Sequence, residues 1–253
     1  MPSLHALCCG RLNADRKIFF PDDELGQRMN LPVPGYLVIH PKGKLLFDTG
    51  IDCRAAVDPV AVLGQRLAST FKYVAAPDEH IAGQLALLDL NCNDISHVAN
   101  SHLHFDHCGC NVLFPRAGFL VQGTELAAAR APKSHAFAPG WDHALDYQAL
   151  DGEHDVFGDG SVLLFPTPGH TPGHQSLKVQ VGKDRWFVMT ADACYTEEHL
   201  ERDLIPGVVW DRSLMRESMA RLRRLGERSD TQLMFGHDDE QWQRLPPRGQ
   251  AIS

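Results

Sequence analysis

Three histidines and one aspartate stand within the six-residue segment His102-Leu103-His104-Phe105-Asp106-His107. Imidazole nitrogen and carboxylate oxygen are both good zinc ligands. In an extended backbone, residues two apart point to the same side, so His102 and His104 can hold one ion together. Asp106 and His107 then turn into the next element and can hold a second ion nearby. The segment therefore predicts a site for two metal ions.

The remaining ligands must come from later in the chain. Asp192 and His237 each follow a strand-like run, and a carboxylate such as Asp192 can bridge two cations. The stretch Pro168-Gly169-His170-Thr171-Pro172-Gly173-His174 offers two histidines, His170 and His174. Because both follow Pro-Gly, their spacing does not choose between them. A water held between two zinc ions about 3.5–4 Å apart is deprotonated near neutral pH and becomes a nucleophile.

Apolar runs bounded by turn residues predict strands along the whole chain. They lie at residues 4–9, 35–40, 44–48, 97–101, 119–122, 161–165, 175–181, 185–190 and 232–235. Helical spacing predicts a helix at 77–90, with Asp78 and Glu79 in its first turn, and another at 214–225, with Ser213 as N-cap.

The predicted site residues repeatedly come just after a strand ends. This order favours an α/β fold in which two mixed sheets pack face to face with helices outside. We expect a single domain over residues 1–253. Residues 131–147 are rich in proline, histidine and aromatics, and they predict an irregular excursion near the site.

Composition narrows the possible functions. The formal net charge is −8, whereas a nucleic-acid enzyme usually presents a basic face, so we expect no nucleic-acid partner. The basic cluster Arg221, Arg223 and Arg224 is expected to be a solvated helix face. No run approaches the roughly 18 apolar residues of a membrane span, so we expect no membrane association. Residues 1–10 lack a signal pattern and the seven cysteines form no disulfide framework, which predicts a cytoplasmic protein.

Four segments of the chain resemble the N-acyl-homoserine lactonases of the metallo-β-lactamase superfamily, and the likeness runs from Asp48-Thr49-Gly50 to His237. The segments are His102 to His107, Gly169-His170-Thr171-Pro172-Gly173-His174-Gln175-Ser176, Asp192-Ala193-Cys194-Tyr195 and Gly236-His237-Asp238. The resemblance implies an αββα sandwich and a cofactor of two Zn²⁺, although other divalent transition metals could occupy such sites. Tyr195, three residues after Asp192, makes the likeness specific to the lactonases.

The resemblance also implies a role for each site residue. His102, His104 and His170 hold the first zinc, Asp106, His107 and His237 hold the second, and Asp192 bridges the two. This choice of His170 over His174 comes from the likeness and not from spacing. Tyr195 points its hydroxyl into the site.

The implied reaction opens the lactone ring of N-acyl-homoserine lactones, a carboxylic-ester hydrolysis that quenches quorum sensing. We expect a metal-bridging hydroxide to attack the carbonyl carbon. Tyr195 donates a hydrogen bond to the developing oxyanion, and Asp106 carries a proton to the leaving oxygen. Asp48 either orients a liganding imidazole or caps a turn. The partner is a small-molecule lactone, and the protein is a monomer or a homodimer.

The acyl chain of such a substrate needs an apolar groove beside the metals. Its candidate residues are Phe19, Phe20, Met29, Phe105, Phe137, Trp141 and Tyr147. Cysteines near the ligands are expected to pack and not to bind metal; they are Cys108, Cys110 and Cys194. The same expectation of a surface or core role holds for His40, His97 and His199.

Other members of the superfamily share the first motif. Another metal-dependent lactonase, such as one resembling 4-pyridoxolactonase, would have the same metal site. A glyoxalase II-like thioester hydrolase usually carries a C-terminal helical extension, whereas only residues 238–253 follow His237. A metal-stabilised binding module would need filled coordination, and five histidines with two aspartates around two ions leave open positions.

Overall fold

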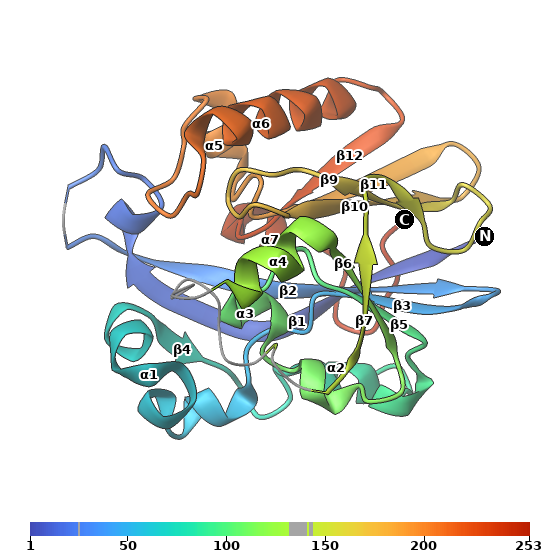
Figure 1. Ribbon diagram of the computed structural model, residues 1–253, viewed down its shortest axis with the longest axis horizontal. Helices are drawn as coiled ribbons and strands as arrows, with labels where there is room; N and C mark the ends of the chain where they lie inside the picture. Colours follow the sequence, from blue (N-terminus) through green and yellow to red (C-terminus); the bar gives the residue numbers. More distant parts are fainter. Residues whose placement is uncertain (25, 132–140, 142–143) are drawn as a thin grey trace.

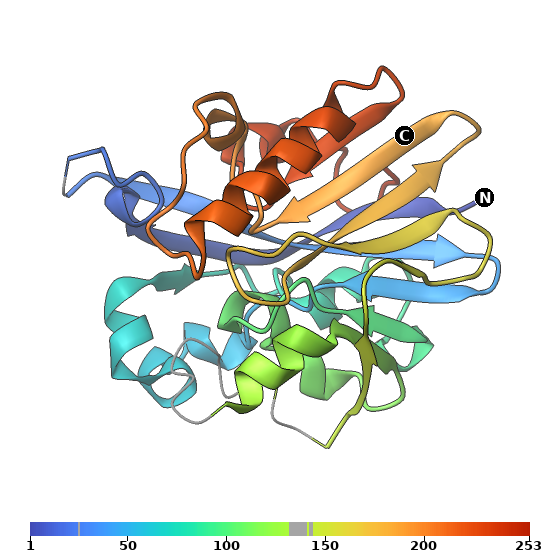
Figure 2. The ribbon, with the colours of Figure 1, turned by 45° about the horizontal axis from the view of Figure 1, so that its top comes forward.

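Two mixed β-sheets stack face to face in the computed structural model, which describes residues 1–24, 26–131, 141 and 144–253 (Figures 1 and 2). The seven-stranded sheet has the order β4-β1-β2-β3-β5-β6-β7, and the five-stranded sheet has the order β12-β11-β10-β9-β8. The pairs β4-β1, β1-β2 and β2-β3 are antiparallel, and the pairs β3-β5, β5-β6 and β6-β7 are parallel. In the second sheet only β11 and β12 are parallel.

The first sheet comprises β1 (Ser3–Asp15), β2 (Arg28–His40), β3 (Gly43–Phe47), β4 (Lys72–Val74), β5 (His97–Ala99), β6 (Gly118–Gln122) and β7 (Asp146–Leu150). The second comprises β8 (His154–Asp155), β9 (Val162–Pro166), β10 (Gln175–Val181), β11 (Arg185–Ala191) and β12 (Thr231–Phe235). The helices are α1 (Pro59–Thr70), α2 (Ile81–Ala86), α3 (Phe105–Cys108), α4 (Gly123–Arg130), α5 (Glu197–Glu201), α6 (Arg212–Gly226) and α7 (Asp239–Gln243). Short 3₁₀ turns lie at Arg16–Ile18, Cys53–Ala56, Cys92–Asp94 and Asn111–Leu113.

The space between the sheets is filled by apolar side chains from both. Val38, Leu45 and Phe47 of the first sheet pack with Leu177 and Phe187 of the second. Alternate strand residues point to opposite faces, so each sheet also presents an outer apolar face that a helix must cover. On the second sheet this cover is α6, whose buried residues Met215, Met219 and Leu222 fall at helical spacing. Helices α1 and α2 cover the first sheet, on the opposite side of the molecule from α6 (Figure 1).

Most of the predicted strands are confirmed, with boundary shifts of a few residues except for β1 and β2, which are longer than predicted. The two helix predictions need correction. Helix α2 is much shorter than 77–90, because the His80 imidazole accepts the Gly83 N–H and starts the helix after Asp78 and Glu79. The N-cap of α6 is Asp211 and not Ser213, since the Asp211 carboxylate accepts the N–H groups of residues 213 and 214.

Two further expectations were wrong in part. The predicted excursion 131–147 extends too far, because β7 begins at Asp146; residues 132–140 and 142–143 lie outside the described part of the chain. The basic cluster on α6 is not a wholly solvated face. Arg221 lies over the Phe165 ring at 4.5 Å, and Arg223 donates to a backbone carbonyl, so only Arg224 of the three is exposed.

Candidate metal centre

The loops that follow five strands meet at one edge of the sandwich and carry the polar residues of the site. Asp48 follows β3, the 102–107 motif follows β5, and His170 follows β9. Asp192 and His237 follow β11 and β12. The motif itself continues into α3, which places Asp106 and His107 on one short helical turn. The expectation that site residues cluster after strand ends is therefore confirmed.

Side chains from these loops form two groups whose ligand-type atoms lie within 4.8 Å of one another. We define the first cluster as His102, His104, His170 and Asp192, and the second cluster as Asp106, His107 and His237. All seven predicted residues are thus brought together, in the division that the resemblance implies. No other group of this kind occurs among the described residues, and His40, His97 and His199 belong to neither cluster.

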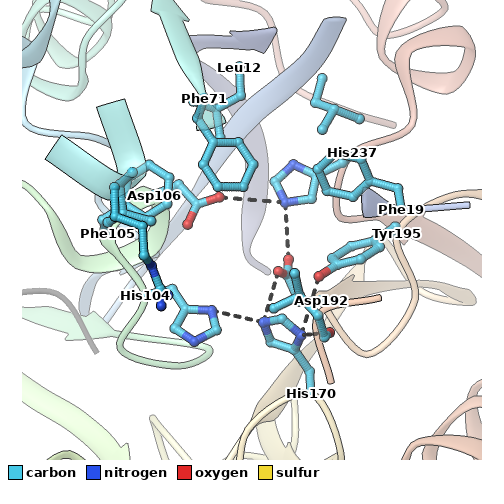
Figure 3. A pocket seen from close by; sticks show the side chains of 14 residues that line it. Leu12, Phe19, Phe71, His104, Phe105, Asp106, His170, Asp192, Tyr195 and His237 are labelled. Carbon is cyan, nitrogen blue, oxygen red and sulfur yellow. Dashed lines mark hydrogen bonds and ion pairs between the residues drawn. The ribbon is translucent and has the colours of Figure 1, made fainter. Parts of the chain in front are cut away.

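Asp192 lies between the two clusters. Its Oδ1 is 3.2 Å from Nε2 of His107 and 3.1 Å from Nε2 of His237. Its Oδ2 is 3.2 Å from Nε2 of His170 and 3.7 Å from Nε2 of His102. Each carboxylate oxygen therefore faces a different cluster (Figure 3), which is the arrangement that a bridging carboxylate requires.

Four of the imidazoles are anchored through Nδ1, so that Nε2 points into the site. His102 donates to Ser101 Oγ at 3.0 Å and His170 to the carbonyl of Val208 at 3.0 Å. His237 donates to the carbonyl of Pro32 at 2.8 Å. Such partners fix both the tautomer and the orientation of a metal-binding imidazole.

The fourth anchor is Asp48, whose two carboxylate oxygens accept three hydrogen bonds. Its Oδ2 accepts from Nδ1 of His107 at 2.8 Å and from Ser101 Oγ at 2.8 Å, and its Oδ1 accepts from the Ser101 N–H at 2.7 Å. Of the two roles left open for Asp48, the structure shows the contact to an imidazole of the site. Asp48 also has a φ of 63°, a left-handed conformation that is uncommon outside glycine.

Burial and neighbouring charges set the protonation of the clusters. Burial lowers the pKa of His102 and of His104, which favours the neutral imidazole that binds a cation. Burial opposes the charge of Asp192, but the imidazoles of His107, His237 and His170 hold its pKa well below the ordinary value. The carboxylate form of Asp192 is therefore maintained.

His174, the alternative to His170, has a different task. Its Nε2 accepts the backbone N–H of Asp192 at 3.1 Å, so Nδ1 must carry the proton and donate to Thr167 Oγ1 at 2.9 Å. Thr167 in turn donates to Ser176 Oγ at 2.8 Å, and Ser176 donates to the carbonyl of Thr190. With both nitrogens used, His174 supports the backbone of Asp192 just after Ala191, where φ is 44°. Burial lowers the pKa of His174 to about 3, which keeps the ring neutral.

Tyr195 stands beside both the first cluster and the pocket. Its hydroxyl lies 3.3 Å from Nδ1 of His170, and its ring packs edge-on against Phe19 at 5.4 Å and beside His237 at 5.4 Å. Burial, together with the nearby carboxylates of Asp192 and Asp106, raises the pKa of Tyr195 well above its ordinary value. The phenol therefore stays protonated and remains a hydrogen-bond donor.

An apolar pocket opens directly onto the clusters (Figure 3). Its polar wall is formed by His104, Asp106, His170, Asp192, Tyr195 and His237, and its remaining residues are Leu12, Phe19, Leu31, Arg66, Leu67, Phe71, Phe105 and Val208. Phe19 and Phe105 are confirmed as lining residues. The prediction is wrong for four residues that do not line the pocket and pack in other parts of the protein, namely Phe20, Met29, Trp141 and Tyr147. Phe137 lies outside the described residues.

Six residues of this pocket wall were missed because they come from separate elements, namely Leu12, Leu31, Arg66, Leu67, Phe71 and Val208. Leu12 and Leu31 lie on β1 and β2, and Phe71 follows α1. Nothing in their local sequence marks them as neighbours. The pairing of Leu12 with Leu31 across the two strands is the only signal, and it is visible only once the register is known.

Comparison with known proteins identifies the family. Residues 29–237 match the sequence model of the metallo-beta-lactamase superfamily. The chain belongs to the metallo-beta-lactamase superfamily. Its αββα sandwich of two mixed sheets, predicted from sequence, is the fold of this superfamily.

Similar proteins within the superfamily are lactonases. N-acyl homoserine lactonase AttM of Azorhizobium caulinodans is 32% identical over 233 residues, which is 86% of each chain. N-acyl homoserine lactonase AiiA of Bacillus thuringiensis subsp. kurstaki is 33% identical over 216 residues, which is 85% of each chain. The structure of an N-acyl homoserine lactone hydrolase with N-hexanoyl-L-homoserine bound at its catalytic metal centre matches with a TM-score of 0.86, at 29% identity, over 99% of this chain and 98% of that one.

Two features bear on the remaining expectations. None of the described helices is both long and apolar enough to cross a membrane. The seven cysteines are unpaired, and Cys108, Cys110 and Cys194 are buried outside the two clusters, in agreement with a packing role.

Proposed function

We propose that this protein is a two-zinc hydrolase that opens the lactone ring of N-acyl-homoserine lactones. The observation that carries the proposal is the pocket, in which an apolar wall suited to an acyl chain meets a polar wall that contains Tyr195 and residues of both clusters. The similarity to AttM and AiiA over most of the chain supports the choice of substrate.

The residues fit two metal ions. His102 Nε2, His107 Nε2 and Asp192 Oδ1 are buried atoms of the two clusters that make no hydrogen bond of good geometry among the described residues, although His107 Nε2 and Asp192 Oδ1 lie 3.2 Å apart. Buried polar atoms are normally satisfied, so these orphaned atoms indicate cation binding. We assign the first zinc to His102, His104 and His170, the second to Asp106, His107 and His237, and the bridge to Asp192. This donor set of imidazoles and carboxylates could also hold other divalent transition metals.

When bound, two zinc ions supply a hydroxide nucleophile at neutral pH and polarise a carbonyl oxygen. The chain itself supplies the hydrogen bond to the developing negative charge. The Tyr195 hydroxyl, kept protonated by burial, points from the wall of the pocket and donates to the oxyanion that forms when the lactone carbonyl is attacked. A donor held in place before the reaction is most effective there, because it needs no reorganisation.

Asp106 is placed to move a proton. Its Oδ2 lies 3.7 Å from Nε2 of His107 and 3.8 Å from Nε2 of His237. This oxygen therefore faces the two histidines of the second cluster. Asp106 also lines the pocket. We therefore assign to its Oδ1 the transfer of a proton from the attacking oxygen to the ring oxygen as the lactone opens. The product is an N-acyl-homoserine.

The proposal is tested with a panel of lactones and one thioester. Purified protein is assayed against N-acyl-homoserine lactones of graded chain length, an aromatic fused lactone and a glutathione thioester, and metal is quantified in the same samples. We expect two zinc ions per chain and hydrolysis of the acyl-homoserine lactones, with a rate that depends on chain length because the pocket wall is apolar.

Each rival has a distinct outcome in this panel. Activity on the fused lactone alone would favour a different lactonase, and activity on the thioester alone would favour a glyoxalase II-like enzyme. Metal binding without hydrolysis of any substrate would leave only a binding module. We also propose a cytoplasmic location, which the unpaired cysteines support.

A further inference from the structure

Glu125 is a fully buried carboxylate that the reaction does not use. It lies in the first turn of α4, has no solvent exposure, and no lysine or arginine of the described ranges is among the groups that shift its pKa. Burial raises the pKa of Glu125, and hydrogen bonds from the Thr171 side chain and from the backbone N–H groups of Leu103 and Gly173 act in the opposite direction. Glutamate is rarely fully buried without a charged partner, so this position calls for a physical explanation.

The two carboxylate oxygens of Glu125 join two loops of the site. Oε1 accepts the backbone N–H of Leu103 at 3.0 Å, and Oε2 accepts the backbone N–H of Gly173 at 2.9 Å. Leu103 stands between His102 and His104, and Gly173 stands three residues after His170. These three histidines are the imidazoles of the first cluster, and they come from loops after β5 and β9, in different sheets.

The two loops pack closely against α4 around Glu125. A methyl group on Gly173 would come within 2.2 Å of the Glu125 backbone nitrogen, so only glycine lets the second loop approach α4 this far. On the other side, Leu103 packs with Leu126 and Ala129 of α4. Helix α4 is therefore a common support for both loops.

We propose that Glu125 is a positioning residue whose carboxylate clamps the two loops together, so that His102, His104 and His170 are held at metal-binding distance before an ion arrives. This role rests on the zinc ligands proposed above. It requires a carboxylate, because two acceptor oxygens serve two N–H donors. Glutamine has one acceptor and one donor group, so in Glu125→Gln one backbone N–H would face an NH₂ group of similar size and opposite function.

The test measures zinc binding to Glu125→Gln by competition with a chromophoric chelator. We expect the affinity of the first cluster to fall at least tenfold, with the second cluster unchanged within about twofold. The same variant is made in a His237→Ala background, where the visible spectrum of bound Co²⁺ reports the first cluster alone and should change with Glu125→Gln. Asp155→Asn is the matched control, since both oxygens of Asp155 also accept backbone N–H groups outside the clusters: Oδ1 accepts from Phe157 and Gly158, and Oδ2 accepts from Gly160.

The proposal is overturned if Glu125→Gln lowers the melting temperature but leaves the zinc affinity and the Co²⁺ spectrum unchanged. Glu125 would then be a purely structural residue. If this variant does not fold, amide exchange in the metal-free wild type decides. Slow exchange at both Leu103 and Gly173 supports a clamp that exists before metal binding, and fast exchange at either overturns it. A wild type that binds no zinc would instead refute the proposed function, so the two failures are distinguishable.

Discussion

Replacing Asp48 with asparagine changes one oxygen of a buried carboxylate to an NH₂ group and removes its charge. The Ser101 N–H and Nδ1–H of His107 donate to opposite oxygens, at 2.7 Å and 2.8 Å. The asparagine oxygen can serve only one of them. The backbone N–H cannot give up its proton, whereas an imidazole can shift its proton from Nδ1 to Nε2 and accept from the new NH₂ group. We therefore expect Asp48→Asn to stabilise the tautomer of His107 that cannot bind metal.

The size of the effect follows from the bond that is lost. A hydrogen bond to a charged group contributes about 1.5–3 kcal/mol. At about 1.4 kcal/mol per tenfold change, this corresponds to a loss of roughly 10- to 100-fold in metal affinity, in agreement with the range found for the outer partners of liganding histidines. The loss should fall on the second cluster, because His107 belongs to it.

The assay is a zinc titration of Asp48→Asn against a competing chelator, with bound metal counted after dialysis. Asp159→Asn is the matched control, because Asp159 forms a hydrogen bond of 2.9 Å with buried His40, outside both clusters. The control should bind zinc like the wild type. Two binding steps of wild-type affinity in Asp48→Asn would refute the argument that Asp48 sets the tautomer of His107.

Three further predictions follow from the site. Tyr195→Phe should lower kcat on the order of 100-fold, as loss of an oxyanion donor does, with zinc content unchanged; wild-type turnover would remove Tyr195 from the reaction. His174→Phe should weaken both zinc sites, because Asp192 loses its backbone partner and faces both clusters; zinc binding and melting temperature equal to wild type would contradict this. Chelation should lower the melting temperature by roughly 5–11 °C for a site saturated 100-fold above Kd, as measured by calorimetry with and without chelator; an unchanged melting temperature would count against a resident metal.

The residues of the two clusters could be predicted because their signal is local. Each side chain lies directly after an apolar run, as with His170 after β9 and Asp192 after β11, and a strand end fixes where a loop begins. The choice between His170 and His174 could not be made from spacing, because it depends on which imidazole reaches the backbone of Asp192. That contact spans 18 residues and two strands.

Elements with weak local patterns were not predicted. Helix α1 is interrupted at Gly64, where φ is 77°, so its apolar residues do not keep one helical period. Strands β4 and β8 have only three and two residues, too few for an alternating pattern. The N-cap of α6 was misplaced by two residues because both Asp211 and Ser213 are good capping residues, and the backbone at Asp211 decides between them.

Three histidines of the site are oriented by hydrogen-bond partners that are distant in the sequence. Nδ1 of His107 is held by Asp48 at the end of β3, Nδ1 of His237 by Pro32 on β2, and Nδ1 of His170 by Val208 in the loop before α6. Each partner lies at least 38 residues from its histidine along the chain. For these three histidines, the direction in which Nε2 points is therefore determined by the packed sandwich and not by the local sequence, whereas His102 is anchored by the adjacent Ser101. A peptide carrying the 102–107 motif alone would have the ligands without their orientation, and its metal affinity should fall accordingly.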